Sequence, residues 1–444
     1  MLFTALFLPP RLREATGDRA WFQAMLDAEA ALARAESECG LIPPSAADAI
    51  AAHCMVDEFD VPAILEEARG MGNPAEPLVR ALRRSVPDEA ADYVHMGATS
   101  QDIVDTAAML VTQRTLRIVE GDLAAAAAAL AQLAMRYRDT PMAGRTLLQQ
   151  AVPVTFGLTA AQWLAGIVRA RAALRRLRGG TLAVQLGGAA GTLAPLGDSG
   201  PSVLHAFSCT LGLAEPALPW HTERTRLAEI AGALSLTAGA LERIALDIIL
   251  LSQTEVGEVA EAGAGRRGGS STMPQKQNPV GAVLARACAR TAQTQAEGLF
   301  RAMAQELERA AGAWQAEWPA LSGALAATGG AAGGLREALD GLAVRPDRMQ
   351  ENLEMTGGLI MAERVATLLA ERLGREQAHQ YVRSLSERAV AEGRRLTDVL
   401  PDDATVRGVL SPGEIRQVMS PSEYLGSSGA FIDRALALYR EQER

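Results

Sequence analysis

The polar stretch at residues 263–279 holds the side chains best suited to chemistry. Its first half is rich in glycine, and Ser270, Lys276 and Asn278 follow in its second half. Glycines allow such a loop to move and its backbone to approach a ligand closely. Lys276 is the only lysine in the sequence, which has 43 lysines and arginines together. Because an ammonium and a guanidinium are not interchangeable, we expect this lysine, with the neighbouring hydroxyl and amide, to be catalytic.

A second polar stretch, residues 94–102, lies just before a long helical segment. Its candidate binding residues are His95, Thr99, Ser100 and Gln101. A helix N-cap at Thr99 or Ser100, with Asp102 favoured by the helix dipole, explains most of this stretch without any function. The N-cap does not explain the histidine.

A third stretch, residues 144–155, mixes an arginine with amide and hydroxyl side chains between two helical segments. Its candidates are Arg145, Thr146 and Gln149, and a plain loop is an equally good interpretation. A fourth stretch, residues 185–192, lacks the glycine spacing and the βαβ surroundings of a dinucleotide site. The 5 histidines and 4 cysteines are scattered without metal-ligand spacing. We therefore expect no cofactor, no metal, and buried thiols in a reducing compartment.

Long helices are predicted to position these stretches. Residues 105–137, 227–251 and 282–318 are each compatible with one continuous helix, and in the second of them apolar residues recur at helical spacing. Segments of this length exceed the average globular helix several-fold and indicate a long helical bundle. Regular β alternation is hard to find.

Shorter helices are predicted at both ends of the chain. Glycine and proline break the first hundred residues at 40–44, 70–74 and 87. Ser411 with Glu414, and Ser420 with Glu423, have the spacing of capping boxes. We expect three helical domains, which are an N-terminal domain at 1–105, a central long-helix bundle at 106–350 and a C-terminal domain at 351–444.

The composition narrows the class of protein. The chain has 444 residues, is 48% hydrophobic and carries a formal net charge of −9. The acidic balance argues against a nucleic-acid partner. Because neither a signal peptide nor an apolar membrane span is recognised, we expect a cytoplasmic protein with no membrane partner.

Residues 270–279 resemble the signature loop of the fumarase/aspartase superfamily, which includes adenylosuccinate lyase and argininosuccinate lyase. Residues 95–105 and 144–155 resemble the family's first and second signature regions, so the resemblance covers essentially the whole chain. It implies an all-α, three-domain fold with a long central bundle. It also implies a homotetramer whose active sites are shared between subunits and bind a small polycarboxylate.

Within the superfamily, the pattern is most similar to that of the cycloisomerases that close a muconate tricarboxylate into a lactone during protocatechuate breakdown. The lyases carry a histidine after Gly-Arg-Thr and a glutamate five residues after the loop asparagine, whereas this chain has Leu147 and Val283 there. Lyases that expel a poor leaving group need a general acid. A carboxylate, with a pKa of roughly 4, leaves or attacks without a proton. The residues after Arg309 also lack the serine and arginine that help adenylosuccinate lyase hold a phosphate.

The resemblance assigns roles to the candidate residues. Ser270 would transfer the proton, while Lys276 and Asn278 would stabilise its alkoxide or the enolate-like intermediate. The residues implied in substrate binding are His95, Thr99, Ser100, Gln101, Arg145, Thr146, Gln149, Ser271, Met273 and Arg309, and His95 is also an alternative proton donor. The alternatives to a cycloisomerase are a fumarate-releasing lyase of the argininosuccinate or adenylosuccinate type and a non-catalytic structural protein.

Overall fold

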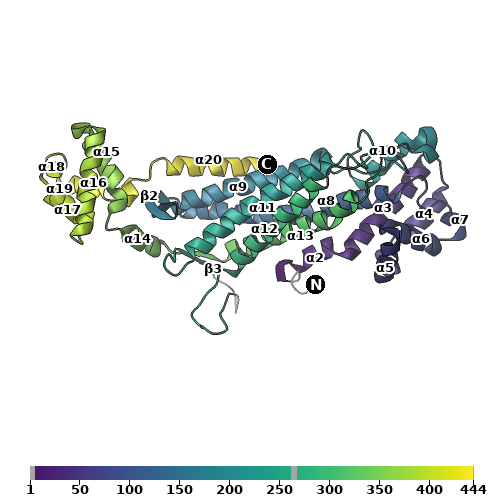
Figure 1. The fold of residues 1–444 in the computed structure, drawn as a ribbon, viewed down its shortest axis with the longest axis horizontal. Helices are drawn as coiled ribbons and strands as arrows, with labels where there is room; N and C mark the ends of the chain where they lie inside the picture. Colours follow the sequence, from purple (N-terminus) through teal and green to yellow (C-terminus); the bar gives the residue numbers. More distant parts are fainter. Residues whose placement is uncertain (1–5, 262–267, 444) are drawn as a thin grey trace. The chain divides into compact units, whose positions relative to one another are not determined.

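The computed structural model of the chain describes residues 6–261 and 268–443, so residues 263–267 of the expected catalytic loop lie outside the described residues. Most described residues are helical and the strands are short (Figure 1), which confirms the all-α class. In chain order the helices are α2 (Pro10–Thr16), α3 (Asp18–Glu38), α4 (Pro44–Ala52), α5 (Val61–Met71), α6 (Ala75–Ser85), α7 (Asp88–Ala91), α8 (Ser100–Arg136), α9 (Phe156–Arg176), α10 (Gly200–Leu211), α11 (Thr225–Leu251), α12 (Val280–Arg301), α13 (Ala313–Asp340), α14 (Pro346–Glu354), α15 (Ala362–Leu373), α16 (Arg375–Ala391), α17 (Leu396–Val399), α18 (Ala404–Arg407), α19 (Pro412–Val418) and α20 (Ser428–Glu443).

The chain forms two compact units. Unit 1 comprises Met1–Ala124, Arg169–Arg243 and Leu284–Arg336, and unit 2 comprises Ala125–Val168, Ile244–Val283 and Glu337–Arg444. The long helices α8, α9, α11, α12 and α13 each contribute residues to both units. The three-domain division at 105 and 350 remains a prediction.

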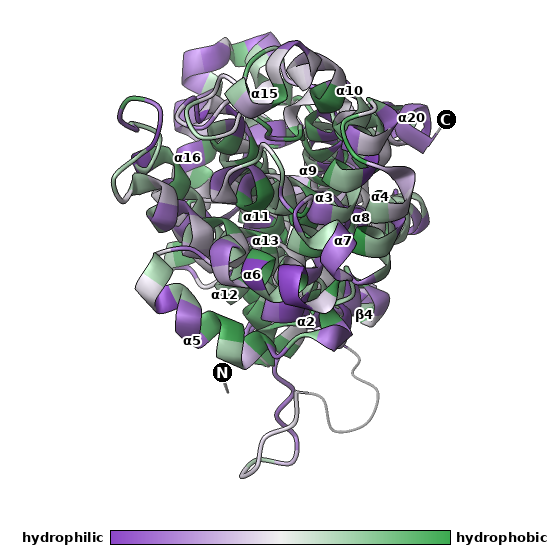
Figure 2. Ribbon diagram, turned by 90° about the vertical axis from the view of Figure 1, so that its right-hand side faces the viewer, coloured by the Kyte–Doolittle hydropathy of each residue, from purple (hydrophilic) through white to green (hydrophobic). Residues whose placement is uncertain are grey.

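Within unit 1, α12 packs closely against α13. A Cβ on Gly298 would lie 3.1 Å from the Cβ of Ala320, and one on Gly323 would lie 2.9 Å from Cδ of Gln295. Glycine at these two positions therefore lets the helices approach. The neighbouring helix α11 buries an apolar stripe that includes Leu227, and Figure 2 shows the predominantly hydrophobic colouring of α11 and α13.

The prediction of a single helix over 282–318 is wrong. Helix α12 ends at Arg301 and α13 begins at Ala313. Between them Leu307 has a φ of 49° and Gly312 a φ of 114°, values that no right-handed helix accommodates. Thr222 donates a hydrogen bond to the carbonyl of Leu307 (2.7 Å), so a tertiary contact holds this segment out of the helical path that its local sequence favours.

The sequence did not predict the two antiparallel strand pairs that the structure contains among its described residues. β1 (Pro141–Thr146) pairs with β2 (Gln149–Thr155) as a hairpin. β3 (Val259–Glu261) pairs with β4 (Leu342–Val344). Burial does not alternate regularly along β1 and β2, and β3 and β4 have three residues each, so neither pair gives a recognisable period-2 signal.

One of the two expected capping boxes is present. Ser411 accepts from the backbone N–H of Glu414, whose carboxylate accepts from the N–H of Ser411, at the start of α19. The expectation at Ser420 is wrong. The segment that follows is a three-residue 3₁₀ turn, and the Ser420 hydroxyl contacts that of Ser422 (2.9 Å) instead.

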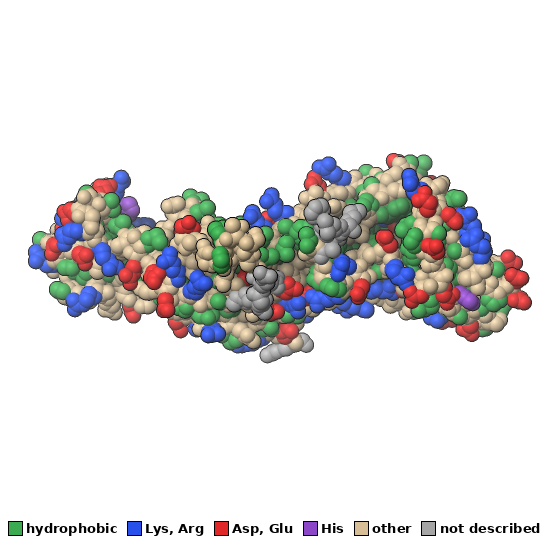
Figure 3. Space-filling model, turned by 90° about the horizontal axis from the view of Figure 1, so that it is seen from below, with side chains coloured by type: hydrophobic (Ala, Val, Ile, Leu, Met, Phe, Trp, Pro, Cys, Tyr) green, Lys and Arg blue, Asp and Glu red, His purple; other side chains and the backbone are tan. Residues whose placement is uncertain are grey.

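The surface mixes charges of both signs, and Figure 3 shows acidic and basic side chains interspersed on one face. Helix α8 is long and apolar enough to cross a membrane by length and composition alone, a test that core helices of water-soluble proteins also pass. All four cysteines are free. The expectation of buried thiols holds for Cys54 and Cys288 but is wrong for Cys209, which is exposed near the end of α10.

Candidate active site

The first group of candidate residues lies in unit 1, where α8 begins. The carboxylate of Asp102 accepts hydrogen bonds from the backbone N–H groups of Gly187 (3.0 Å), Gly188 (2.9 Å) and Thr99 (3.0 Å). Nε2 of the buried His221 lies 2.7 Å from the same carboxylate. Asp102 therefore ties the stretch at 185–192 to the start of α8, which gives this glycine-rich segment a structural role.

Gln101 and Arg309 extend this group. Gln101 is fully buried and donates to the carbonyl of His221 (2.8 Å). Arg309 donates to Oε1 of Gln101 (3.0 Å) and to the carbonyl of Ala189 (2.8 Å). In this structure both side chains bind the protein's own polar groups, and their expected role in holding substrate carboxylates remains a proposal.

His95 is held in an uncommon conformation beside a buried acid. Its φ is 62°, a region that residues other than glycine rarely adopt. Nδ1 lies 2.6 Å from Oε1 of Glu29 on α3, and the Glu29 side chain is 1% exposed. Burial opposes the imidazolium, but the charge of Glu29 and its hydrogen bond outweigh burial, so the pKa of His95 lies above its ordinary value.

A second buried acid, Glu36, follows on α3. Burial, and then repulsion from Glu29, raises the pKa of Glu36 to about 9. Neither carboxyl oxygen of Glu36 has a hydrogen-bond partner among the described residues. Glu36 is therefore protonated and neutral near pH 7.

We expect Glu36→Gln to stabilise the protein above pH 5. The unfolded chain releases this proton near the ordinary value of 4.5 and the folded chain near pH 9, so the free energy of unfolding falls as pH rises between these values. At pH 7 the wild type loses up to about 3 kcal/mol in this way, and a neutral amide avoids the loss. Thermal unfolding at pH 5, 7 and 9 tests this. Parallel curves for the two proteins would mean that Glu36 is ionised in the fold.

The second group of candidates lies on the β1–β2 hairpin of unit 2. Arg145 makes two hydrogen bonds to the carboxylate of Glu258, from Nη2 to Oε1 (2.7 Å) and from Nη1 to Oε2 (3.0 Å). Glu258 is fully buried and also accepts from Nδ2 of Asn352 (2.8 Å). A Cβ on Gly144 would lie 2.6 Å from the carbonyl oxygen of Val152, so the backbone irregularity beside Arg145 requires glycine. The buried acid fixes the arginine that is expected to hold a substrate carboxylate.

Leu147 and Leu148 form the two-residue turn of this hairpin, between Thr146 and its strand partner Gln149. Their φ values are 51° and 63°, and their exposed fractions are 96% and 73%. Positive φ at both positions is typical of a type I′ turn, which favours Asn-Gly and disfavours leucine. Two exposed apolar side chains in a strained turn indicate a requirement other than the stability of this chain.

We therefore expect Leu147→Asn combined with Leu148→Gly to stabilise the chain by about 1 kcal/mol while lowering its activity. Thermal unfolding and steady-state kinetics measure the two effects. The control is Leu218→Asn, at a leucine that is 75% exposed and lacks the positive φ. A less stable double variant would show that the leucines pack against something this chain needs.

The third group lies on the loop that leads into α12, which Figure 1 shows projecting from the start of that helix. The hydroxyl oxygen of Ser270 accepts hydrogen bonds from the backbone N–H groups of Thr272 (3.2 Å) and Met273 (3.0 Å). Donors aimed at a hydroxyl oxygen also stabilise the alkoxide that remains when its proton leaves. The loop thus supplies the hydrogen-bond donors that a serine acid–base group needs to stabilise its alkoxide.

Asn278 closes the base of this loop. Its backbone N–H and its Nδ2 both donate to the carbonyl of Gly268, at 2.9 and 3.0 Å. Gly268 has a φ of 75°, and a Cβ there would lie 2.4 Å from the carbonyl oxygen of Asn278, so only glycine fits. Lys276 is exposed, and its side chain forms no hydrogen bond or ion pair with the described residues. Ser271 and Met273 are exposed on the same loop.

The structure thus places five candidates in unit 1 and eight on two segments of unit 2. The unit 1 set is His95, Thr99, Ser100, Gln101 and Arg309, and the unit 2 set is Arg145, Thr146, Gln149, Ser270, Ser271, Met273, Lys276 and Asn278. Sequence reasoning missed two of the carboxylates that fix them, Glu29 and Glu258, and gave Asp102 only a helix-dipole role. Among the described residues no group of three or more His, Cys, Asp or Glu is arranged to hold a metal.

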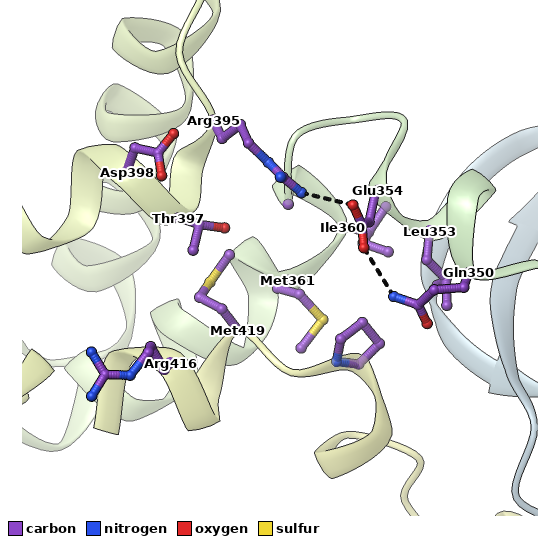
Figure 4. A pocket seen from close by; sticks show the side chains of 12 residues that line it. Gln350, Leu353, Glu354, Ile360, Met361, Arg395, Thr397, Asp398, Arg416 and Met419 are labelled. Atoms are coloured by element: carbon purple, nitrogen blue, oxygen red, sulfur yellow. Dashed lines mark hydrogen bonds and ion pairs between the residues drawn. The ribbon is translucent and has the colours of Figure 1, made fainter. Parts of the chain in front are cut away.

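A separate cavity of about 230 Å³ in unit 2 contains none of the candidates. Figure 4 shows Arg395 pointing to Glu354 (3.3 Å), which also accepts from Gln350 (3.1 Å), with Met361 and Met419 beside them. Because Arg395 and Glu354 pair with each other and none of the candidates lies here, we assign this cavity no part in the proposed chemistry.

Comparison with known proteins identifies the family. The family model described as "Lyase" matches residues 9–293, and "Adenylosuccinate lyase C-terminus" matches residues 358–435. The chain is 47% identical to the 3-carboxy-cis,cis-muconate cycloisomerase of Bradyrhizobium diazoefficiens, over 96% of this chain and 95% of that protein. It is 43% identical to a nitrosuccinate lyase of Streptomyces davaonensis, over 95% and 91% of the two chains.

A solved structure agrees with these sequence matches. The 3-carboxy-cis,cis-muconate lactonizing enzyme from Pseudomonas putida superposes with a TM-score of 0.94 at 42% identity, covering 100% of both chains. Such coverage includes both units and all three groups of candidate residues. The chain therefore belongs to the lyase family of the fumarase/aspartase superfamily, and its sequence and fold resemble the 3-carboxy-cis,cis-muconate cycloisomerases within it.

Proposed function

We propose that this protein is a cycloisomerase that closes 3-carboxy-cis,cis-muconate into 4-carboxymuconolactone. The names of the relatives support this function. The observation that carries it is the pair Leu147 and Val283, apolar side chains at the positions where the lyases place a histidine and a glutamate. An internal carboxylate nucleophile needs no general acid or base on that side, and the protein avoids an unpaired charge.

The proposed reaction forms one C–O bond and one C–H bond. A substrate carboxylate adds to a conjugated double bond, and the electron pair moves onto the neighbouring carboxylate as an enolate-like intermediate. Ser270 donates its proton to the adjacent carbon, and the N–H groups of Thr272 and Met273, with Lys276, stabilise the alkoxide until it regains a proton from water. His95, Arg145 and the remaining binding residues hold the carboxylates, and in the reverse direction Ser270 abstracts the proton.

A second function, elimination from a nitrosuccinate, is favoured by the same two apolar residues. Nitrite is a weakly basic leaving group, so its loss also needs no general acid, and one relative is a nitrosuccinate lyase. Fumarate-releasing lyases that expel an amine are disfavoured by the same reasoning.

We further propose a homotetramer in the cytoplasm, with active sites shared between subunits. The resemblance to the superfamily supports the shared sites, as does the exposed apolar hairpin tip at Leu147 and Leu148. Analytical ultracentrifugation measures the assembly. A monomer with full activity would contradict shared sites.

The test is the ultraviolet absorbance of purified protein mixed with 3-carboxy-cis,cis-muconate. Lactonisation removes part of the conjugation, so the absorbance should fall rapidly. If the muconate remains unchanged while nitrosuccinate, argininosuccinate or adenylosuccinate yields fumarate, the cycloisomerase proposal fails and a lyase replaces it.

A further inference from the structure

We propose that Glu29 is a positioning residue of the active site, which fixes the imidazole of His95 through Nδ1 so that Nε2 donates to a carboxylate of the substrate. This inference rests on the proposed function for its substrate. Its physical basis, the contact between Glu29 and His95, belongs to unit 1 alone.

Both the imidazole and the backbone at His95 are held in place. The contact of 2.6 Å joins Nδ1 to a carboxylate oxygen whose side chain is 1% exposed, while the His95 side chain is 15% exposed. The backbone that carries His95 is fixed as well, because Arg83 donates to the carbonyl of Val94 (3.0 Å). Among the described residues none hydrogen-bonds to Nε2, so that nitrogen is available to an incoming anion.

The charged groups around His95 come from three helices. Glu29 on α3 and Asp102 on α8 favour the imidazolium, and Arg83 on α6 opposes it. Asp102 is already occupied by His221 (2.7 Å) and by backbone N–H groups. Glu29 is thus the carboxylate that bonds His95 directly, and the one whose removal changes this histidine most.

Glu36 adds no negative charge next to Glu29 near pH 7. Both acids lie on α3, and both are buried. Because Glu36 is neutral near pH 7, it adds no charge beside Glu29, and the imidazole of His95 is the group that contacts the Glu29 carboxylate. Oε2 of Glu29 has no partner among the described residues, so His95 is the principal partner of this carboxylate.

The experiment is an NMR titration of the imidazole signals in the free protein, comparing wild type with Glu29→Gln. Glutamine keeps an acceptor for Nδ1–H but removes the charge, so the midpoint of His95 should fall by about 1–3 pH units. The five histidines are few enough to resolve, and the His95→Gln variant assigns the signal. An unmoved midpoint would overturn the proposal.

The exposed pair of His205 and Glu215 provides a matched control. It has the same atoms in contact, Nδ1 and a glutamate oxygen at 2.8 Å, but side chains that are 68% and 43% exposed. Glu215→Gln should move the midpoint of His205 only slightly and leave the kinetics unchanged, since exposed pairs contribute little. Glu36→Gln should leave the midpoint of His95 nearly unchanged.

Kinetics separate positioning from mere structure. In Glu29→Gln the KM for 3-carboxy-cis,cis-muconate should rise, by about tenfold at high pH, and return toward the wild-type value as the pH is lowered and His95 binds a proton. A loss that is equal at every pH would assign Glu29 a structural role and overturn the proposal. If the wild type does not turn over the muconate, the proposed function fails, and the titration still decides whether Glu29 sets the charge of His95.

Discussion

Ser270→Ala is expected to lower kcat for lactonisation about 1000-fold while leaving the fold intact. A positioned acid–base group contributes roughly 100- to 10,000-fold, and alanine removes the only atom of this side chain that carries a transferable proton. The N–H groups of Thr272 and Met273 would then face a methyl group instead of the hydroxyl oxygen. Because the loop is exposed at these residues, water can satisfy both donors, and the melting temperature should stay within about 1 °C of the wild type. Stopped-flow absorbance at saturating substrate measures the effect.

Ser252→Ala is the matched control for this variant. That hydroxyl donates to the carbonyl of Ile248 (2.6 Å) at the end of α11, in the same unit, and its loss should leave kcat unchanged. If Ser270→Ala retained more than about a tenth of the wild-type kcat, proton transfer by serine would be contradicted. His95 would then be the next proton donor to test, with His95→Gln.

The helices that the sequence predicts well are those in which local pattern and packing agree. The predicted segment 105–137 corresponds to α8, and the apolar residues at helical spacing in 227–251 lie in the core-facing stripe of α11. The break after Arg301 could not be predicted because contacts with residues distant in sequence impose it. Local preference does not include such contacts.

The candidate site likewise contains residues that the sequence predicts and partners that it does not. Residue types and spacing were sufficient to nominate Ser270 and Lys276, because a glycine-rich loop with a hydroxyl and an ammonium needs no tertiary information. The partners that set charge and orientation were not predictable. Glu29 lies 66 residues from His95, and Glu258 lies 113 residues from Arg145. Neither glutamate differs in its local sequence from an ordinary surface acid, so only the fold identifies it.

Arg224→Met is expected to lower the free energy of unfolding by about 3–5 kcal/mol, which is the usual effect of removing one partner from a buried ion pair. Arg224 donates to Asp105 from Nη1 (2.8 Å) and to Glu317 from Nε (3.0 Å), and all three side chains are buried. Burial opposes its charge, but the two carboxylates outweigh burial and hold the pKa of Arg224 above its ordinary value. Without the guanidinium, two buried carboxylates repel each other beside the indole N–H of Trp314 (3.0 Å). Urea unfolding at pH 7 measures the loss.

The control for this variant is Arg226→Met, two residues along the chain. Arg226 lies over the same Trp220 ring as Arg224, with its guanidinium carbon 5.2 Å from the ring centroid against 4.8 Å. Its hydrogen bonds go to the backbone carbonyls of Gly180 and Thr181. Because no buried carboxylate loses its partner, this variant should cost about 1 kcal/mol. Equal losses in the two variants would assign the stabilisation to the aromatic contact. A loss confined to Arg224→Met that diminishes at low pH, where Glu317 binds a proton, would assign it to the buried charges.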